Sequence, residues 1–254
     1  MSATAVPADF WETLPLHAGV RLIAKDANGL AAFDKPAVVL SHPNGSEDEA
    51  RALLTCRYDK DAQCFHWKTA DGAPRWLWLL NRLDSATSGV ILTASSEKLA
   101  LAVREHFAKK QVHKIYNALV FGRPQKPRDI WRDQVAVKRQ GGRIRTATIG
   151  NVPVETHFEV IRHAQRTFST ALIRLEPRTG RSHQLRVQCA KHQVPIVGDQ
   201  TYGDFAANRE FGKVTKQKRL FLHSLETSFN YEFAGKTFPF KASATLPPEF
   251  LAGY

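Results

Sequence analysis

Two apolar runs separated by a short polar segment place the strongest constraint on how this chain can fold. Trp76 to Leu80 and Val90 to Ala94 each have the length of a buried strand, and polar turn residues bound both runs. The segment between them contains the acidic residue Asp84. The pattern predicts a carboxylate held at the end of a rigid β element. An aspartate here is also typical of an ordinary turn or helix cap, so the segment alone leaves both interpretations open.

Strand patterns dominate the rest of the chain. Arg21 to Lys25 and Leu30 to Asp34 flank Asn28-Gly29, which predicts a hairpin. We expect extended chain at 38–42 and further strands at 115–121, 135–138, 143–149, 154–161, 168–176, 220–222 and 231–241. The hairpin spacing predicts an α+β fold, with a mixed, mostly antiparallel β-sheet core flanked by a few helices and loops.

Three segments carry helix signals. Ser46 and Glu49 form a capping-box pattern, and Ser95-Ser96 can cap a helix that runs to about Lys110. The third predicted helix covers 182–193, whereas 204–219 is predicted to be a basic loop. Residues 1–18 are expected to be an irregular N-terminal extension, followed by a single domain over 19–254.

The charge balance indicates the kind of partner. The formal net charge is +12, and such an excess favours a polyanion, of which nucleic acid is the usual one. A generic cationic surface is the alternative. Two basic clusters could bind a nucleic-acid backbone and make affinity salt-dependent, with a solvated face as the alternative for each. They are Lys138, Arg139, Arg143 and Arg145, and then Lys213, Lys216, Lys218 and Arg219.

Cysteine usage and hydropathy indicate the compartment. The three cysteines show no tight pairing, which favours a reducing compartment, and we expect a cytoplasmic protein. Cys56, Cys64 and His66 lack the repeated spacing of a metal site, so no metal is expected. We see no signal peptide and no run that could span a membrane. Nothing in the sequence requires more than a monomer.

Several sequence blocks, taken in order, resemble the RluA-type pseudouridine synthase family. Arg82-Leu83-Asp84-x-x-Thr87-Ser88-Gly89 looks like the catalytic motif of that family. Four other blocks are similar to the family's and follow in the same order: Asp34-Lys35-Pro36, the segment 114–122 (KIYNALVFG), the segment 180–187 (GRSHQLRV) with 195–203 (PIVGDQTYG), and the segment 219–224 (RLFLHS). Together with the catalytic motif they cover roughly residues 20 to 245.

The chain departs from the family pattern at two places. Asn81 stands where histidine is common, and Ala37-Val38-Val39 replaces the more usual continuation after the Asp-Lys-Pro block, so that loop is expected to differ in shape. Neither departure affects Asp84. The small S4 domain that precedes the catalytic domain in some relatives is not expected within the first 18 residues.

The resemblance assigns catalytic roles to three residues. It implies that Asp84 is the carboxylate that acts as a nucleophile or stabilises positive charge at the sugar carbon. Arg186 is implied to pair with that carboxylate and keep it ionised, and Tyr116 to stack on the extruded uracil, with its hydroxyl a candidate for C5 deprotonation. Without the resemblance, Arg186 would be read as a surface charge and Tyr116 as a half-buried strand residue.

The resemblance assigns substrate contacts to four more residues. Leu222 is implied to pack on the base or on the tyrosine ring. An ordinary position in the hydrophobic core is the alternative, and the two expectations partly coincide. Arg82 is implied to replace the flipped base or contact phosphate, and Arg181 and His183 are weaker candidates for RNA contact.

The sequence therefore favours an RNA uridine isomerase that acts on structured ribosomal or transfer RNA after base flipping. The reaction involves no redox change or group loss, so no cofactor is expected. A non-catalytic RNA-binding or RNA-chaperone protein on the same fold is one alternative. A glycoside or nucleoside hydrolase is another, but it usually needs a second carboxylate, and none stands nearby in sequence.

Overall fold

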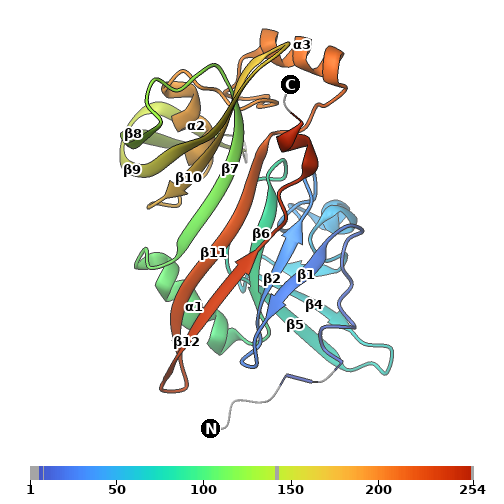
Figure 1. Cartoon of the computed structure of the whole chain (residues 1–254). Coiled ribbons are helices and arrows are strands. Elements are labelled where there is room, and N and C mark those ends of the chain that lie inside the picture. Colours follow the sequence, from blue (N-terminus) through green and yellow to red (C-terminus); the bar gives the residue numbers. More distant parts are fainter. Residues whose placement is uncertain (1–5, 8, 141–142, 253–254) are drawn as a thin grey trace. The chain divides into compact units, whose positions relative to one another are not determined.

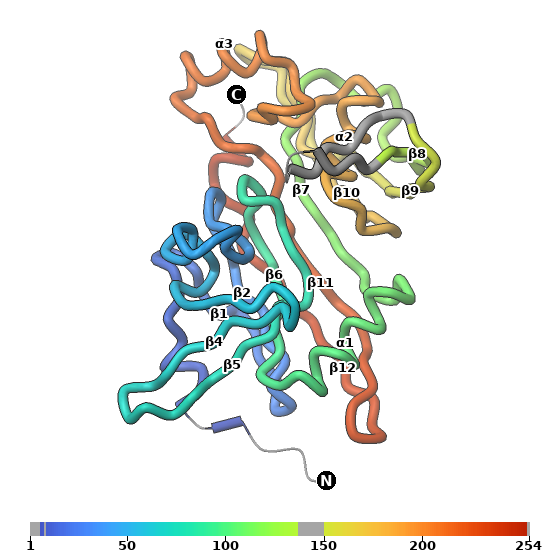
Figure 2. The backbone as a smooth tube through the Cα atoms, turned by 180° about the vertical axis from the view of Figure 1, so that it is seen from behind, coloured from blue at the N-terminus to red at the C-terminus, as the bar shows by residue number. Residues whose placement is uncertain are grey.

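The structure, a computed structural model, describes residues 6–7, 9–140 and 143–252; of 137–140 and 143–149 it describes the backbone only. The chain divides into two units (Figures 1 and 2). Unit 1 comprises Met1–Val112 and Glu226–Ala244, and unit 2 comprises His113–Leu225 and Thr245–Tyr254. The two units are described separately below.

Unit 1 contains a series of antiparallel strands, each paired with the next in space. In spatial order they are β1 (Arg21–Lys25), β2 (Leu30–Lys35), β6 (Ser88–Ala94), β5 (Pro74–Leu79), β4 (Cys64–Lys68) and β3 (Arg57–Asp59). The unit also contains an antiparallel hairpin, formed by the Glu226–Phe233 part of β11 (Leu222–Phe233) and β12 (Lys236–Ser243). The predicted first hairpin and the two predicted strands beside Asp84 are confirmed.

The core of unit 1 lies between its strands and α1 (Glu97–Ala108). Every residue of β6 is buried, which explains its continuous apolar sequence. The hydroxyl of Ser96 accepts a hydrogen bond from the Leu99 amide and so caps α1, as predicted. Leu99 and Val103 lie on one side of the helix and are fully buried against residues of β2, β6, β11 and β12.

Unit 2 contains four antiparallel strands, in the order β7 (His113–Phe121), β10 (Ser169–Pro177), β9 (Arg143–Gln165) and β8 (Arg128–Gln140). The segments 143–149 and 154–161, predicted as two strands, form one. Their junction holds a bulge, where the pairing register shifts between Val135 and Ala136. A Cβ atom at Gly150 would collide with the Ala136 backbone, so the bulge requires glycine.

The predicted hairpin loop between β8 and β9 falls partly outside the described residues. Gln140 pairs with Arg143, whereas Gly141 and Gly142 are not described. The side chains of the first basic cluster, 138–145, also lie outside the described residues, so its RNA contacts stay a prediction.

Two α-helices and the 3-10 helix Pro248–Leu251 complete the described part of unit 2. The predicted helix at 182–193 is confirmed as α2 (Gln184–Lys191), which packs Val187 against Val135 and Val154 of the sheet. The predicted basic loop at 204–219 is wrong, because Phe205–Thr215 forms the helix α3. The Asp204 side chain caps α3 by accepting from the amides of Ala206 and Ala207.

Three other local predictions are also wrong. The capping box at Ser46 is not formed: Ser46–Arg51 is a 3-10 helix with no buried residue and no side-chain cap. Val38 has a φ of 70°, which breaks the extended chain expected at 38–42. The strand expected at 231–241 turns back on itself at Ala234 and Gly235, whose φ values of 50° and 76° form the turn between β11 and β12.

The α+β class is confirmed, with a mostly antiparallel sheet and few helices. The single-domain assignment over 19–254 stays a prediction. None of the helices among the described residues has the length and apolar character needed to cross a membrane.

Candidate active site

Asp84 lies in the loop that connects β5 with β6 in unit 1. Its side chain is half-buried, and its carbonyl accepts a hydrogen bond from the Thr87 amide at 2.9 Å, which closes a turn. The strand that follows is entirely buried. The loop is therefore a short connection between two fixed strands, as the sequence predicts.

Hydrogen bonds from the segment 38–41 fix the backbone on both sides of Asp84. The Ser41 hydroxyl donates to the Leu83 carbonyl at 2.7 Å and accepts from the Leu83 amide at 2.9 Å. After Asp84, the carbonyl of Ser85 accepts from the Val38 amide at 2.7 Å. The residues before and after the carboxylate are thus tied to the same neighbouring segment, which limits the conformations open to Asp84.

A fully buried lysine completes this support. Lys35 is 0% exposed, and its ammonium donates to the carbonyls of Pro36 at 3.0 Å, Val39 at 2.7 Å and Ser85 at 3.2 Å. Burying a charge is costly unless hydrogen bonds satisfy it, and these carbonyls provide them. Lys35 therefore joins the Asp-Lys-Pro block to the Asp84 loop, a role for which the sequence carries no signal.

Arg82 is exposed and lies beside His42. The His42 Nδ1 is 2.9 Å from the Pro43 carbonyl, so it donates and leaves Nε2 as an acceptor, 3.5 Å from the Arg82 Nη1. Burial lowers the pKa of His42, the Pro43 hydrogen bond raises it, and the charges of Arg82 and Lys60 lower it further. The net downward shift favours the neutral ring that can accept from Arg82.

The remaining predicted residues belong to unit 2. Tyr116 lies on β7 opposite Leu175 of β10 and is half-buried, and Leu222 begins β11 with 4% of its surface exposed. Asp84 and Arg82 belong to unit 1, so the predicted pairing of Asp84 with Arg186 stays a prediction.

Arg186, on α2, has a buried carboxylate partner in Asp199. Its Nε and Nη2 donate to the two carboxylate oxygens of Asp199, each at 2.8 Å, in a bidentate pair. The Arg186 guanidinium also lies over the Tyr202 ring, 5.2 Å from its centroid. Burial alone would raise the pKa of Asp199, but hydrogen bonds and the charge of Arg186 bring it below its ordinary value.

His183 and Arg181 lie at the start of α2. His183 has a left-handed backbone, with a φ of 57°, and its Nδ1 is 2.9 Å from the Tyr202 hydroxyl. Arg181 is exposed, and its amide donates to the Gln184 side chain at 3.2 Å. Arg186, His183 and Tyr202 thus form one connected group within unit 2.

Asp199 and Tyr202 were missed as functional candidates, although the sequence contains a signal for both. They are the acidic and aromatic positions of the segment 195–203, which comes after the arginine-bearing segment 180–187 in the chain. Buried acidic residues are usually paired, so an aspartate that follows the apolar run Pro195 to Val197 could have been matched with Arg186.

The described residues contain no group of three or more histidine, cysteine, aspartate or glutamate side chains that could hold a metal ion. Cys56, Cys64 and Cys189 are free thiols. Burial, and to a smaller extent the charge of Glu49, raise the pKa of the Cys56 thiol to about 12, against a weaker opposing hydrogen bond at His66. Cys56 is therefore protonated at neutral pH and a poor metal ligand.

Comparisons with known proteins agree with the sequence blocks. The model of the family described as RNA pseudouridylate synthase matches residues 29–191. The chain is 32% identical to the tRNA pseudouridine synthase C of Vibrio cholerae over 80% of this chain and 83% of the relative. It is also 32% identical to the ribosomal large subunit pseudouridine synthase C of Escherichia coli, over 66% of this chain and 53% of that relative. The chain thus spans about half the length of this second relative.

A solved structure shows the same fold. Human RNA pseudouridylate synthase domain containing 1 matches with a TM-score of 0.65 and 20% identity, over 91% of this chain and 86% of that one. The family match over residues 29–191 and the similarity to the Vibrio cholerae relative together show that this chain belongs to the RNA pseudouridylate synthase family, whose members are isomerases that form pseudouridine in RNA.

Proposed function

We propose that this pseudouridine synthase acts on a uridine in structured ribosomal or transfer RNA and uses Asp84 as its nucleophile. We infer these two substrate classes from its relatives, of which one is named a tRNA pseudouridine synthase and another a ribosomal large subunit pseudouridine synthase. The observation that carries the proposal is the fixed position of Asp84, whose neighbours Leu83 and Ser85 are held by Ser41, Val38 and Lys35. A nucleophile gains most from this kind of preorganisation.

The proposed reaction rearranges bonds without a redox partner. The target nucleotide leaves its stack, at a cost of a few kcal/mol that loops and bulges reduce. The bond between N1 of the base and C1′ of the sugar breaks, with Asp84 as nucleophile. The base rotates, and C5 bonds to C1′ as the bond between Asp84 and C1′ breaks and frees the carboxylate. The proton lost from C5 is balanced by the one that N1 gains. No cofactor takes part in this scheme.

The other predicted residues keep their proposed roles. We propose that Tyr116 stacks on the extruded base and that its hydroxyl takes part in removing the C5 proton. Arg186 is proposed to keep the catalytic carboxylate ionised. Arg82, Leu222, Arg181 and His183 are proposed as substrate contacts. The free thiols of Cys56, Cys64 and Cys189 are consistent with a cytoplasmic enzyme, which we propose acts as a monomer.

Replacement of Asp84 tests the proposal. We expect Asp84→Asn to lower kcat on the order of 10³-fold or more, because the amide cannot act as a nucleophile, while RNA binding is retained. Pseudouridine is measured after incubation with ribosomal and transfer RNA from a strain that lacks the gene, and binding is measured by fluorescence anisotropy. Asp61→Asn, an exposed carboxylate in the turn between β3 and β4, is the matched control.

A normal yield of pseudouridine from Asp84→Asn would contradict the assignment. Release of free uracil by the wild-type enzyme would instead support a hydrolase. RNA binding without any product from the wild-type enzyme would support the non-catalytic alternative.

A further inference from the structure

Helix α3 and the segment 216–218 that follows it present a basic and aromatic surface that no step of the proposed reaction uses. We infer that this surface docks the substrate RNA outside the reacting nucleotide, by binding its phosphate backbone and an unpaired base. The inference rests on the proposed function. The α3 surface is defined by the residues Phe205, Arg209, Lys213, Lys216 and Lys218, all of which are exposed. In Figure 1, α3 is the orange helix at the top.

The opposite side of α3 is fixed to unit 2. Phe211 is 1% exposed, and its ring lies 5.9 Å from Phe121, 5.2 Å from Phe168 and 5.6 Å from Phe221. Helix periodicity then determines which residues face away. Phe205, Arg209 and Lys213 follow one another at four-residue intervals and form a single stripe. The buried side thus holds this stripe toward solvent.

The cations of the α3 surface are available to an anion. Among the residues that the structure describes, Arg209, Lys216 and Lys218 form no ion pair. Lys213 lies 3.6 Å from Glu210, but both side chains are mostly exposed, and such pairs contribute little. An RNA backbone can bind these groups without first breaking a strong protein ion pair.

Phe205 adds a feature that phosphate binding does not require. It is 53% exposed in the first turn of α3, although phenylalanine normally lies inside a protein. Arg209 follows it one helical turn later, on the same side. An exposed aromatic ring beside a cation is the arrangement that proteins use to stack unpaired RNA bases while they bind the adjoining phosphate.

Asn208 connects α3 with the partner of Arg186. Its side-chain nitrogen donates to the Asp199 carbonyl at 3.0 Å, and its oxygen accepts from the Gly198 amide at 2.6 Å. Asp199 in turn holds Arg186 through the bidentate pair. The α3 surface therefore has a fixed position relative to Arg186 within unit 2, as a docking site that sets the register of the RNA requires.

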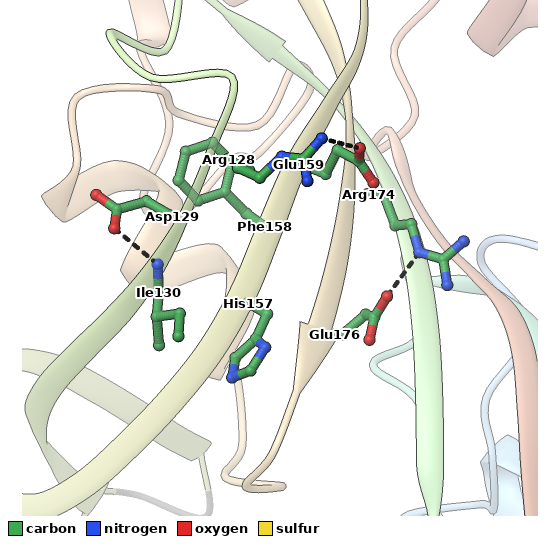
Figure 3. Close-up of a pocket in the computed structure, with 8 residues that line it drawn as sticks. All are labelled: Arg128, Asp129, Ile130, His157, Phe158, Glu159, Arg174 and Glu176. Atoms are coloured by element: carbon green, nitrogen blue, oxygen red, sulfur yellow. Dashed lines mark hydrogen bonds and ion pairs between the residues drawn. The ribbon is translucent and has the colours of Figure 1, made fainter.

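A second charged area, formed by β8, β9 and β10 in the same unit, provides a contrast. It contains a pocket of about 240 Å³ that is lined by charged side chains (Figure 3). There, Arg174 pairs with Glu176 at 2.7 Å, and Arg128 lies 3.7 Å from Glu159. Because glutamates neutralise the charge of these arginines, this area is a poorer match for phosphate than the α3 surface.

The inference is tested by removing charges from the α3 surface and measuring RNA binding, not the formation of pseudouridine. The variant R209Q/K216Q/K218Q is compared with K25Q/K110Q/K236Q, which removes three exposed lysines of unit 1 that form no ion pair among the described residues. Both carry Asp84→Asn, so that product formation is slow compared with the binding measurement. The probes are fluorescently labelled bulk transfer RNA and, separately, fragmented ribosomal RNA, and the melting temperature of each variant confirms that it is folded.

We expect the α3 variant to raise the Kd on the order of tenfold and to reduce the slope of log K against log salt by about two, as the loss of three phosphate contacts predicts. The control is expected to shift the Kd much less. Equal weakening by both variants would mean that only net charge matters and would overturn the inference, as would unchanged binding by the α3 variant.

Phe205 is tested separately. We expect Phe205→Ala to raise the Kd severalfold without changing the salt slope, whereas Phe205→Tyr, which keeps the ring, binds normally. Equal binding by the alanine variant and the wild type would remove base stacking from the inference. Pseudouridine formation by the wild type on the same RNAs is measured in parallel. A failure of the proposed function would then show as absent product with α3-dependent binding intact.

Discussion

The pair formed by Arg186 and Asp199 shows how one residue can depend on another that the motifs leave unassigned. Only 9% of the Arg186 side chain and 1% of the Asp199 side chain are exposed, so the pair holds both charges largely out of water. Asp199 also accepts from the amides of Thr201 and Tyr202, which fixes its orientation. The position of Arg186 is therefore set by a carboxylate 13 residues further along the chain.

We predict that Asp199→Asn lowers the free energy of unfolding by about 3–5 kcal/mol, because it removes the carboxylate from a buried bidentate pair with Arg186. Urea denaturation measures this loss. Asp204→Asn is the control, since asparagine caps a helix as well as aspartate does. The folded pKa of Asp199 is lowered, so its contribution is present above the ordinary value of 3.8 and is lost as pH falls through the lowered pKa. The difference in free energy of unfolding between the wild type and Asp199→Asn should therefore become smaller below that pH. The prediction would be contradicted if this difference stayed the same at low pH, or if the two proteins were equally stable at pH 7.

At the scale of elements, apolar patterning succeeded where local sequence decides the structure. The strands beside Asp84 and the helix α1 follow from apolar runs and a serine cap. Helix α3 was missed because its main buried residue, Phe211, packs on aromatic rings from distant segments, which no local pattern reveals. In β9, Gly150 and Pro153 resemble a turn, but both lie within one bulged strand.

The same reasoning explains what could be predicted of the site. Asp84 and its loop were recognisable from sequence because the motif and both strands are contiguous in the chain. The support from Lys35 and Ser41 was not, because a lysine is normally exposed and its burial depends on carbonyls from separate segments.

Helix α2, which carries Arg186, is attached to the sheet of unit 2 through a buried polar network. The Gln188 side chain donates to Asp133 at 2.8 Å and to the Trp131 carbonyl at 3.3 Å, and accepts from the Thr156 hydroxyl at 2.6 Å. Gln188 and Thr156 are both 0% exposed. Such a network holds its parts rigidly when every member is satisfied and becomes costly when one is removed.

We predict that Gln188→Met, which is similar in size but cannot hydrogen-bond in the same way, destabilises the protein by about 1–3 kcal/mol. Thr156→Val removes the hydroxyl that this change leaves without an acceptor. The double variant should therefore lose less stability than the sum of the two single variants, by at least about 0.5 kcal/mol. Chemical denaturation of all four proteins completes the cycle, and strictly additive losses would show that the network does not act as a unit.

For the molecule as a whole, the net charge of +12 has a consequence for how the enzyme finds RNA. A strongly basic protein binds RNA largely by displacing counterions from phosphates, and this contribution falls as salt rises. The interior is less sensitive, because its packing and buried hydrogen bonds are shielded from ions in solution. Substrate binding and folding should therefore respond differently to salt.

We predict that the slope of log K against log salt for RNA binding is about −4 or steeper, as expected for roughly six phosphate contacts. Between about 0.05 M and about 0.2 M salt, KM should rise by orders of magnitude while kcat at saturating RNA stays nearly constant. The melting temperature should change little over the same range, and Asp84→Asn should show the wild-type slope, since it alters the reaction and not the docking. If log K for RNA binding did not change with log salt, the RNA would be bound by hydrogen bonds and stacking and not by charge. The excess of lysine and arginine would then need another explanation.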